Sequence, residues 1–224
     1  MAQNQFKIIA TFVFLGFLAT MGLLVLSFIA PDASQFHLPS DGSTQLLMPS
    51  TMTRNQSDRN IWSVIIDNFF IIGYTGIFIG AYLYCKETGY YAKLALIFGL
   101  VTTATDIIEN AMVVAISNSM TIGYQPDPLL WGLFWSISAV KDISACVSAF
   151  SFAVIFLLTL SDKPVIRFNK FVFALLFLLF ALIGSMGLFS PLFLALRNIL
   201  FVVDLIIASY LFYKTDESVL HEGL

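Results

Sequence analysis

Seven ionisable residues lie inside long apolar stretches of this 224-residue sequence, where an unpaired charge is hardest to accommodate. They are Asp67, Asp106, Glu109, Lys141, Asp142, Arg197 and Asp204. A charged side chain at the centre of a membrane-spanning helix costs about 3 kcal/mol, so such residues normally face a bundle interior or a water-filled cavity. Carboxylates and cations gathered in such a place could exchange protons or stabilise a developing negative charge.

The densest polar spacing is in segment 105–110, which reads Thr-Asp-Ile-Ile-Glu-Asn. Asp106, Glu109 and Asn110 lie at positions i, i+3 and i+4, which places them on one face of a helix. Two carboxyl groups on one face can act as acid and base. We therefore predict catalytic roles for Asp106 and Glu109, and for Lys141, whose ammonium could stabilise an oxyanion or hold a phosphate.

The other ionisable residues of these stretches, together with Asn110, are predicted to bind substrate. They are Asp67, Asn110, Asp142, Arg197 and Asp204. At a rise of about 1.5 Å per residue, Arg197, Asp67 and Glu109 lie about 8–10 Å below the predicted outer ends of their helices. We expect Arg197 to pair across helices with Asp67 or Glu109, its neighbours in depth. All seven ionisable residues are expected in the outer half or the midplane, which predicts an outward-facing pocket.

The charges of this set do not balance. Five acids against two bases leave an excess of carboxylates, so at least one acid is expected to be protonated near neutral pH. A group in that state could move protons. The alternative is a structural network, in which protonated acids donate hydrogen bonds and hold the helices in register. Both interpretations stay open on the sequence alone.

The elements that must position these residues are membrane-spanning helices. Hydrophobic residues make up 58% of the chain and charged residues 11%, against roughly 25% charged residues in a soluble domain. Crossing a hydrocarbon core of about 30 Å takes about 20 apolar residues. Six runs qualify, at about 8–30, 61–84, 94–116, 131–160, 171–188 and 192–213. The sequence therefore predicts an all-α, polytopic transmembrane bundle that forms one domain over residues 1–224.

The distribution of basic residues predicts the orientation of the bundle. Lysine and arginine gather at both termini and on alternate connections, at Lys7, Lys86, Lys93, Lys163, Arg167, Lys170 and Lys214. Because short cytoplasmic segments carry the excess of basic residues, both termini are predicted to be cytoplasmic. Residues 31–60 then form an extracytoplasmic polar loop. We expect the protein to be integral to a membrane, the bacterial inner membrane being the predicted location.

Metal, haem and nucleic-acid chemistry find little support in the sequence. His37 and His221 lie in polar segments outside every apolar run, and Cys85 and Cys146 form no CxxC pattern. No metal site is predicted, and the sequence identifies no cofactor. The net charge of −3 offers no basic face for nucleic acid.

Segment 105–110 resembles the intramembrane Asp-x-x-Glu-Asn motif of small bacterial multi-pass membrane proteins of uncharacterised activity. In those proteins an aspartate on the preceding helix and a lysine on the following helix recur, and Asp67 and Lys141 match them here. The resemblance covers roughly residues 61–145. It implies a multi-pass membrane fold and no particular activity, and Arg197 and Asp204 have no counterpart in it.

Three functions compete. The leading hypothesis is an enzyme that acts on a lipid or lipid-like substrate by acid/base chemistry, although the sequence has no Gly-x-Ser-x-Gly nucleophile motif. The second is a proton- or cation-coupled small-molecule transporter, although no internal repeat supports it. The third is a non-catalytic scaffold or complex subunit. Expected partners are membrane lipids, a small-molecule or lipid ligand and further copies in an oligomer.

Overall fold

The computed structural model describes residues 5–29, 52–85, 88–161, 163–187 and 190–215. They form six helices: α1 (Gln5–Ile29), α2 (Arg54–Cys85), α3 (Tyr90–Thr121), α4 (Pro128–Leu158), α5 (Pro164–Gly187) and α6 (Pro191–Lys214). The described ranges contain no strand, and all six helices include a stretch long and apolar enough to cross a membrane. The predicted all-α class with six spans is confirmed, and the chain is an integral membrane protein.

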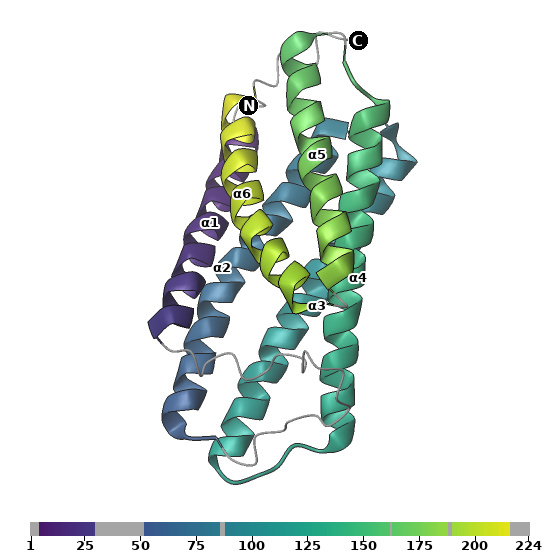
Figure 1. The fold of residues 1–224 in the computed structure, drawn as a ribbon. Helices are drawn as coiled ribbons and strands as arrows, with labels where there is room; N and C mark the ends of the chain where they lie inside the picture. Colours follow the sequence, from purple (N-terminus) through teal and green to yellow (C-terminus); the bar gives the residue numbers. More distant parts are fainter. Residues whose placement is uncertain (1–4, 30–51, 86–87, 162, 188–189, 216–224) are drawn as a thin grey trace.

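Each helix packs against the next in the chain, and α6 closes the bundle against α1. Phe6 near the start of α1 stacks on Phe212 near the end of α6, at 6.0 Å between ring centroids. Ser209 Oγ donates a hydrogen bond to the Ala10 carbonyl oxygen at 3.0 Å. The first and last helices therefore join at one end of the bundle, where α1 begins and α6 ends (Figure 1). We call this the terminal end.

Small residues let α1 and α2 approach closely. A Cβ atom added to Gly16 would lie 2.5 Å from the Cα atom of Gly73, so only glycine fits at this crossing. One turn further along α2, Gly76 faces Val13 of α1. Gly80 leaves the space that the Phe212 ring of α6 occupies. Such small-residue contacts are a common way of packing membrane helices, where the hydrophobic effect contributes little to association.

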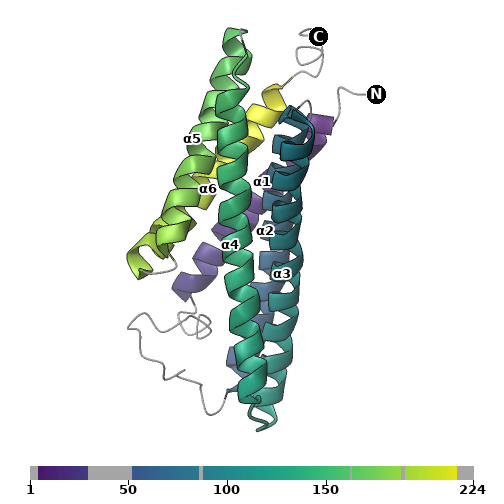
Figure 2. The same cartoon turned by 90° about the vertical axis from the view of Figure 1, so that its right-hand side faces the viewer.

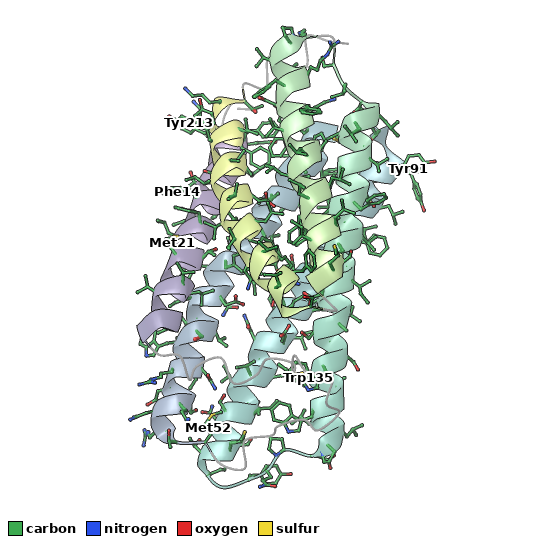
Figure 3. The ribbon with its side chains drawn as sticks, in the orientation of Figure 1. Phe14, Met21, Met52, Tyr91, Trp135 and Tyr213 are labelled. Carbon is green, nitrogen blue, oxygen red and sulfur yellow. The ribbon has the colours of Figure 1, made fainter. Side chains whose placement is uncertain are left out.

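Three helices are longer than a bilayer requires. α2 and α3 have 32 residues each and α4 has 31, which corresponds to about 48 Å of helix against a hydrocarbon core of about 30 Å. Figures 1 and 2 show them extending together past the ends of α1, α5 and α6. We call this part the extended end. Its own small core contains Met52, Met120, Trp131 and Phe134, and Trp135 packs against it; Figure 3 labels Met52 and Trp135.

The start of α2 corrects the predicted loop. Residues 54–60 were expected in the polar loop 31–60 but form the first two turns of α2, and residues 30–51 lie outside the described ranges. Thr53 and Gln56 form a reciprocal capping box. The Thr53 amide donates to Gln56 Oε1 at 2.9 Å, and the Gln56 amide donates to Thr53 Oγ1 at 3.3 Å. The helix can be polar here because it lies in the extended end.

The terminal half of the bundle is filled by aromatic rings. Phe152 and Phe156 of α4 stack on Phe177 of α5, with ring centroids 5.6 and 6.1 Å apart. Phe173 stacks on Phe212 of α6 at 5.0 Å. Offset-stacked aromatic pairs add to the favourable packing of this core. This part of the bundle is therefore held together mainly by the packing of aromatic side chains.

The described basic residues of the predicted cytoplasmic segments all lie toward the terminal end. They are Lys7, Lys93, Lys163, Arg167, Lys170 and Lys214. Tyr91 and Tyr213 project outward there (Figure 3). Interfacial tyrosines and lysines are typical of helix ends at a membrane surface. Which side of the membrane this end faces stays a prediction.

Candidate functional site

Lys141 of α4 is held between two carboxylates of α3. Its Nζ atom lies 3.1 Å from Asp106 Oδ1 and 2.5 Å from Glu109 Oε2. The i, i+3 spacing of the two acids puts both carboxylates on the face that α4 covers. The three residues predicted to be catalytic are therefore brought together. Ser138, one turn before Lys141, donates to Glu109 Oε1 at 3.3 Å and extends the network toward the extended end.

Asp106 links this ion pair to α2. Its second carboxylate oxygen, Oδ2, accepts a hydrogen bond from the Tyr74 hydroxyl at 2.8 Å. Asp106 is 6% exposed and Tyr74 is buried, so the bond lies in the bundle interior. Glu109, Lys141, Asp106 and Tyr74 thus form one bonded chain across three helices. Charge-assisted hydrogen bonds of this kind are roughly twice as strong as neutral ones.

Asp67 and Asn110 form a second contact between α2 and α3. Asn110 Nδ2 donates to Asp67 Oδ2 at 2.8 Å and approaches Asn68 Oδ1 at 3.3 Å. Asn110 is one helical turn from Asp106, which keeps this contact next to the Lys141 network. The carboxylate of Asp67 is therefore held by an amide and not by a cation.

The predicted partner of Arg197 was wrong. Arg197 Nη1 of α6 lies 2.8 Å from Asp142 Oδ1 of α4, not beside Asp67 or Glu109. Equal predicted depth did not identify the partner of Arg197, because depth along the membrane does not tell which helices adjoin. The expected divergence of Lys141 and Asp142 by about 100° on one helix explains the outcome. Lys141 faces α3, and Asp142 faces α6.

A cavity of about 100 Å³ lies between the two ion pairs. Asp106, Lys141, Asp142 and Arg197 contribute its charged lining. Its apolar lining comes largely from Phe70, Tyr74, Phe78, Phe180 and Phe201. An engineered apolar cavity of about 150 Å³ holds a benzene molecule, so this space suits a solute of a few heavy atoms or several waters. Asp67, Glu109 and Asn110 do not line it.

Asp204 stands apart from the network. It was predicted to bind substrate in the same pocket, but it lines a second cavity of about 30 Å³ among aromatic rings nearer the terminal end. Asp204 is 9% exposed, and its Oδ1 atom has no hydrogen-bond partner among the described residues. Tyr74, Phe78, Phe180 and Phe201 line both cavities, so one layer of aromatic side chains separates Asp204 from the ion pairs.

Hydroxyl groups join the helices next to the ion pairs. Thr102 of α3 and Ser144 of α4 share a hydrogen bond of 2.9 Å, and Thr75 of α2 and Thr103 of α3 share one of 2.8 Å. Ser148 Oγ donates to the Ala95 carbonyl oxygen at 2.8 Å. Together they form a seam of neutral contacts from the network into the apolar half.

Sequence reasoning did not select Tyr74 or the aromatic layer as part of the site. Tyr74 lies seven residues after Asp67, so both fall on one face of α2, and this spacing could have identified it. Phe180 and Phe201 carry no such signal, because apolar residues occupy most positions of α5 and α6. Within the described ranges, no group of three or more His, Cys, Asp or Glu side chains is arranged to hold a metal ion.

Comparisons with known proteins add no assignment. No protein-family model matches the chain significantly, and neither does any curated protein or solved structure. The resemblance of segment 105–110 to the Asp-x-x-Glu-Asn motif therefore stays a prediction.

Proposed function

We propose that the protein is a proton-coupled carrier of a small cationic solute. The observation that carries this proposal is the bonded chain from Glu109 through Lys141 and Asp106 to Tyr74, which runs beside the cavity between the ion pairs. Intramembrane acids linked by hydrogen bonds are typical of proton relays in pumps and transporters. Tyr74 also lines the cavity of Asp204, so the chain extends from the extended end toward the aromatic half.

The balance of charge favours a cation over an anion. Both cationic side chains of the site, Lys141 and Arg197, are already paired with carboxylates. Asp67 and Asp204 have no cationic partner within 4.0 Å among the described residues. A site with surplus carboxyl groups can hold either protons or a cation, and a group that exchanges one for the other couples their movements.

The enzyme hypothesis receives less support. A lipid phosphate would need a free cation, and Lys141 and Arg197 are engaged. The cavity of about 100 Å³ is also small for a lipid headgroup, which brings a phosphate and its ester groups. Action on a lipid therefore stays a prediction, as do the scaffold role and the oligomer.

Orientation and location belong to the same proposal. We place the terminal end on the cytoplasmic side of a bacterial inner membrane, because Lys7, Lys93 and Lys214 lie toward it, as do the basic residues that begin α5. The cavity between the ion pairs would then lie nearer the outer face. Labelling with a membrane-impermeant thiol reagent tests this orientation. A single cysteine introduced at residue 125 should react from outside the cell, and one introduced at residue 7 should not.

Proton flux in proteoliposomes tests the carrier. Purified protein is reconstituted with a trapped pH indicator, and flux is followed after addition of tetramethylammonium, which has no neutral form that could cross the bilayer unaided. Wild-type protein is expected to move protons in response to the tetramethylammonium gradient. Lys141→Met is expected to reduce this flux at least tenfold, because it leaves Asp106 and Glu109 facing each other without their shared cation.

Lys93→Met is the matched control, since Lys93 is exposed at the start of α3 and lies outside the network. Its flux should equal that of wild type. Flux in Lys141→Met that equals wild type, at equal amounts of folded protein, would contradict the proposal. No flux in wild-type liposomes with any of a set of small cations would also contradict it.

A further inference from the structure

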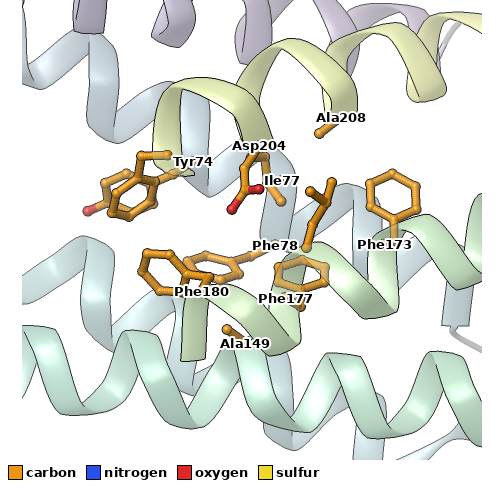
Figure 4. A pocket seen from close by; sticks show the side chains of 11 residues that line it. Tyr74, Ile77, Phe78, Ala149, Phe173, Phe177, Phe180, Asp204 and Ala208 are labelled. Carbon is orange, nitrogen blue, oxygen red and sulfur yellow. The ribbon is translucent and has the colours of Figure 1, made fainter. Parts of the chain in front are cut away.

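The cavity around Asp204 is lined mostly by aromatic side chains. Six of its lining residues are aromatic: Tyr74, Phe78, Phe173, Phe177, Phe180 and Phe201. The carboxyl group of Asp204 points from α6 into this space and faces Phe180 and Phe177 (Figure 4). It is the one charged group among the residues that line the cavity.

An ionised carboxylate in these surroundings lacks a counter-charge. Asp204 Oδ1 is fully buried and no described residue donates to it, while Lys141 and Arg197 are occupied elsewhere. Burying an unpaired charge is expensive unless something neutralises it, so the site holds a proton or binds a cation. Natural membrane helices rarely keep such a group without a use for it.

The lining determines which cation fits. A metal ion such as Na⁺ or Ca²⁺ is held by several oxygen ligands, and this cavity offers only Asp204, since the Tyr74 hydroxyl donates to Asp106. Aromatic faces instead attract organic ammonium groups, whose charge interacts with the ring quadrupole within about 6 Å. One carboxylate surrounded by aromatic rings matches an organic ammonium cation with small alkyl groups.

We propose that Asp204 and its aromatic neighbours form a binding site for a small alkylammonium cation. The Asp204 carboxylate pairs with the ammonium, and Tyr74, Phe180 and Phe201 contact its alkyl groups. The volume of about 30 Å³ next to Asp204 admits about one or two heavy atoms, so the ammonium group occupies it, and the alkyl group lies among the rings of Tyr74, Phe180 and Phe201, which line both cavities. That this ligand is the transported solute rests on the proposed function; the binding itself does not.

Binding to the detergent-solubilised full chain tests the site without any transport. Ethylammonium and ethanol have the same number of heavy atoms, so their difference in binding measures the effect of the charge. With three heavy atoms, ethylammonium is expected to bind with a Kd of about 1 mM, and ethanol at least tenfold more weakly. Isothermal titration calorimetry at matched ionic strength measures both.

Asp204→Asn should weaken ethylammonium binding at least tenfold and leave the weak binding of ethanol unchanged. Asp58→Asn, an exposed carboxyl on α2, is the matched control and should bind as wild type. A second variant, Ala208→Val, retains the carboxylate but adds two methyl groups to the cavity lining, and it should also weaken binding if the cavity is the site.

Several results would overturn the proposal. These are absence of ethylammonium binding to wild type, equal binding of ethanol, or unchanged binding in Asp204→Asn. If Asp204→Asn fails to fold, unchanged binding in Ala208→Val has the same consequence. Ethylammonium binding without any proton flux would support this binding site and contradict the carrier function. Tetramethylammonium-driven flux that persists in Asp204→Asn would support the carrier function and show that the solute does not pass through this site.

Discussion

The polar network around Lys141 and the aromatic core of the terminal half solve the packing of membrane helices in different ways. In the network, specific pairs join the helices, as Lys141 joins Asp106 and Arg197 joins Asp142. In the core, the rings of Phe152, Phe173 and Phe212 pack through the complementarity of their shapes, without hydrogen bonds or ion pairs of their own. The core therefore stabilises the fold, while the network and the cavity beside it provide the chemistry. Asp204 is the exception, since it is a charge placed among the rings.

The largest expected effect is on the crossing of α1 and α2. Gly73→Leu would drive a side chain into the backbone of Gly16, and the neighbouring backbone has no room to move aside. We expect the variant not to assemble, as judged by its loss from the monodisperse peak in size-exclusion chromatography. Gly132→Leu is the control, because nothing lies within 4 Å of a Cβ atom there. Normal assembly of both variants would show that the crossing is looser than described.

The next effect concerns the aromatic core. Phe152 is 0% exposed, and its replacement by alanine leaves a cavity that costs about 3–5 kcal/mol. For a chain of this size, that corresponds to a fall in melting temperature on the order of 10 °C. Phe150→Ala removes the same phenyl group two residues earlier and is the control. Because Phe150 is 52% exposed, its replacement should change the melting temperature little. Equal melting temperatures of Phe152→Ala and Phe150→Ala in detergent would contradict the proposal that the aromatic core stabilises the fold.

A double-mutant cycle on Arg197 and Asp142 measures how much the charge of this pair contributes to the stability of the network. Arg197→Met should destabilise by about 3 kcal/mol, because Asp142 is left without its cation. Adding Asp142→Asn should recover part of that loss, with a coupling of about 1–3 kcal/mol in the double-mutant cycle. Thermal unfolding of the four proteins measures it. Strictly additive effects would mean that the pair contributes nothing specific.

The smallest effect is on the hydroxyl seam. Thr102→Val removes the bond to Ser144 at 2.9 Å, and hydrogen bonds between membrane helices contribute about 0.6 kcal/mol on average. A fall in melting temperature of about 2 °C is expected. Thr105→Val serves as the control, since the Thr105 hydroxyl donates to the carbonyl oxygens of Val101 and Thr102 in its own helix. A fall in melting temperature as large as that of Phe152→Ala would contradict the smaller contribution to stability predicted for the hydroxyl seam.

The sequence was sufficient for the class, the spans and the centre of the network. Length and hydropathy determine how many helices cross a membrane, and the i, i+3 spacing of Asp106 and Glu109 determines that both face the same neighbour. The start of α2 at Arg54 also has a signal in the sequence, the Thr53–Gln56 capping box. A search for long apolar runs misses this start, because the first turns of the helix are polar.

Other features of the site could not be read from the sequence. The partner of Arg197 depends on which helices adjoin, and depth along the membrane gives no information about adjacency. The isolation of Asp204 depends on the rings of Phe180 and Phe201, which come from two helices that are apolar throughout. Only the three-dimensional arrangement separates these phenylalanines from the others that face lipid.

The most direct measurement compares proton flux per folded molecule in Glu109→Gln and Phe152→Ala. Glutamine retains the size of Glu109 and leaves Lys141 paired with Asp106, so Glu109→Gln should melt near the wild-type temperature and lose at least nine-tenths of its tetramethylammonium-driven proton flux. Phe152→Ala should melt much lower, yet retain wild-type flux for each molecule that remains folded at low temperature. The reverse pattern, with full flux in Glu109→Gln and a loss in folded Phe152→Ala, would contradict the separation of chemistry from packing.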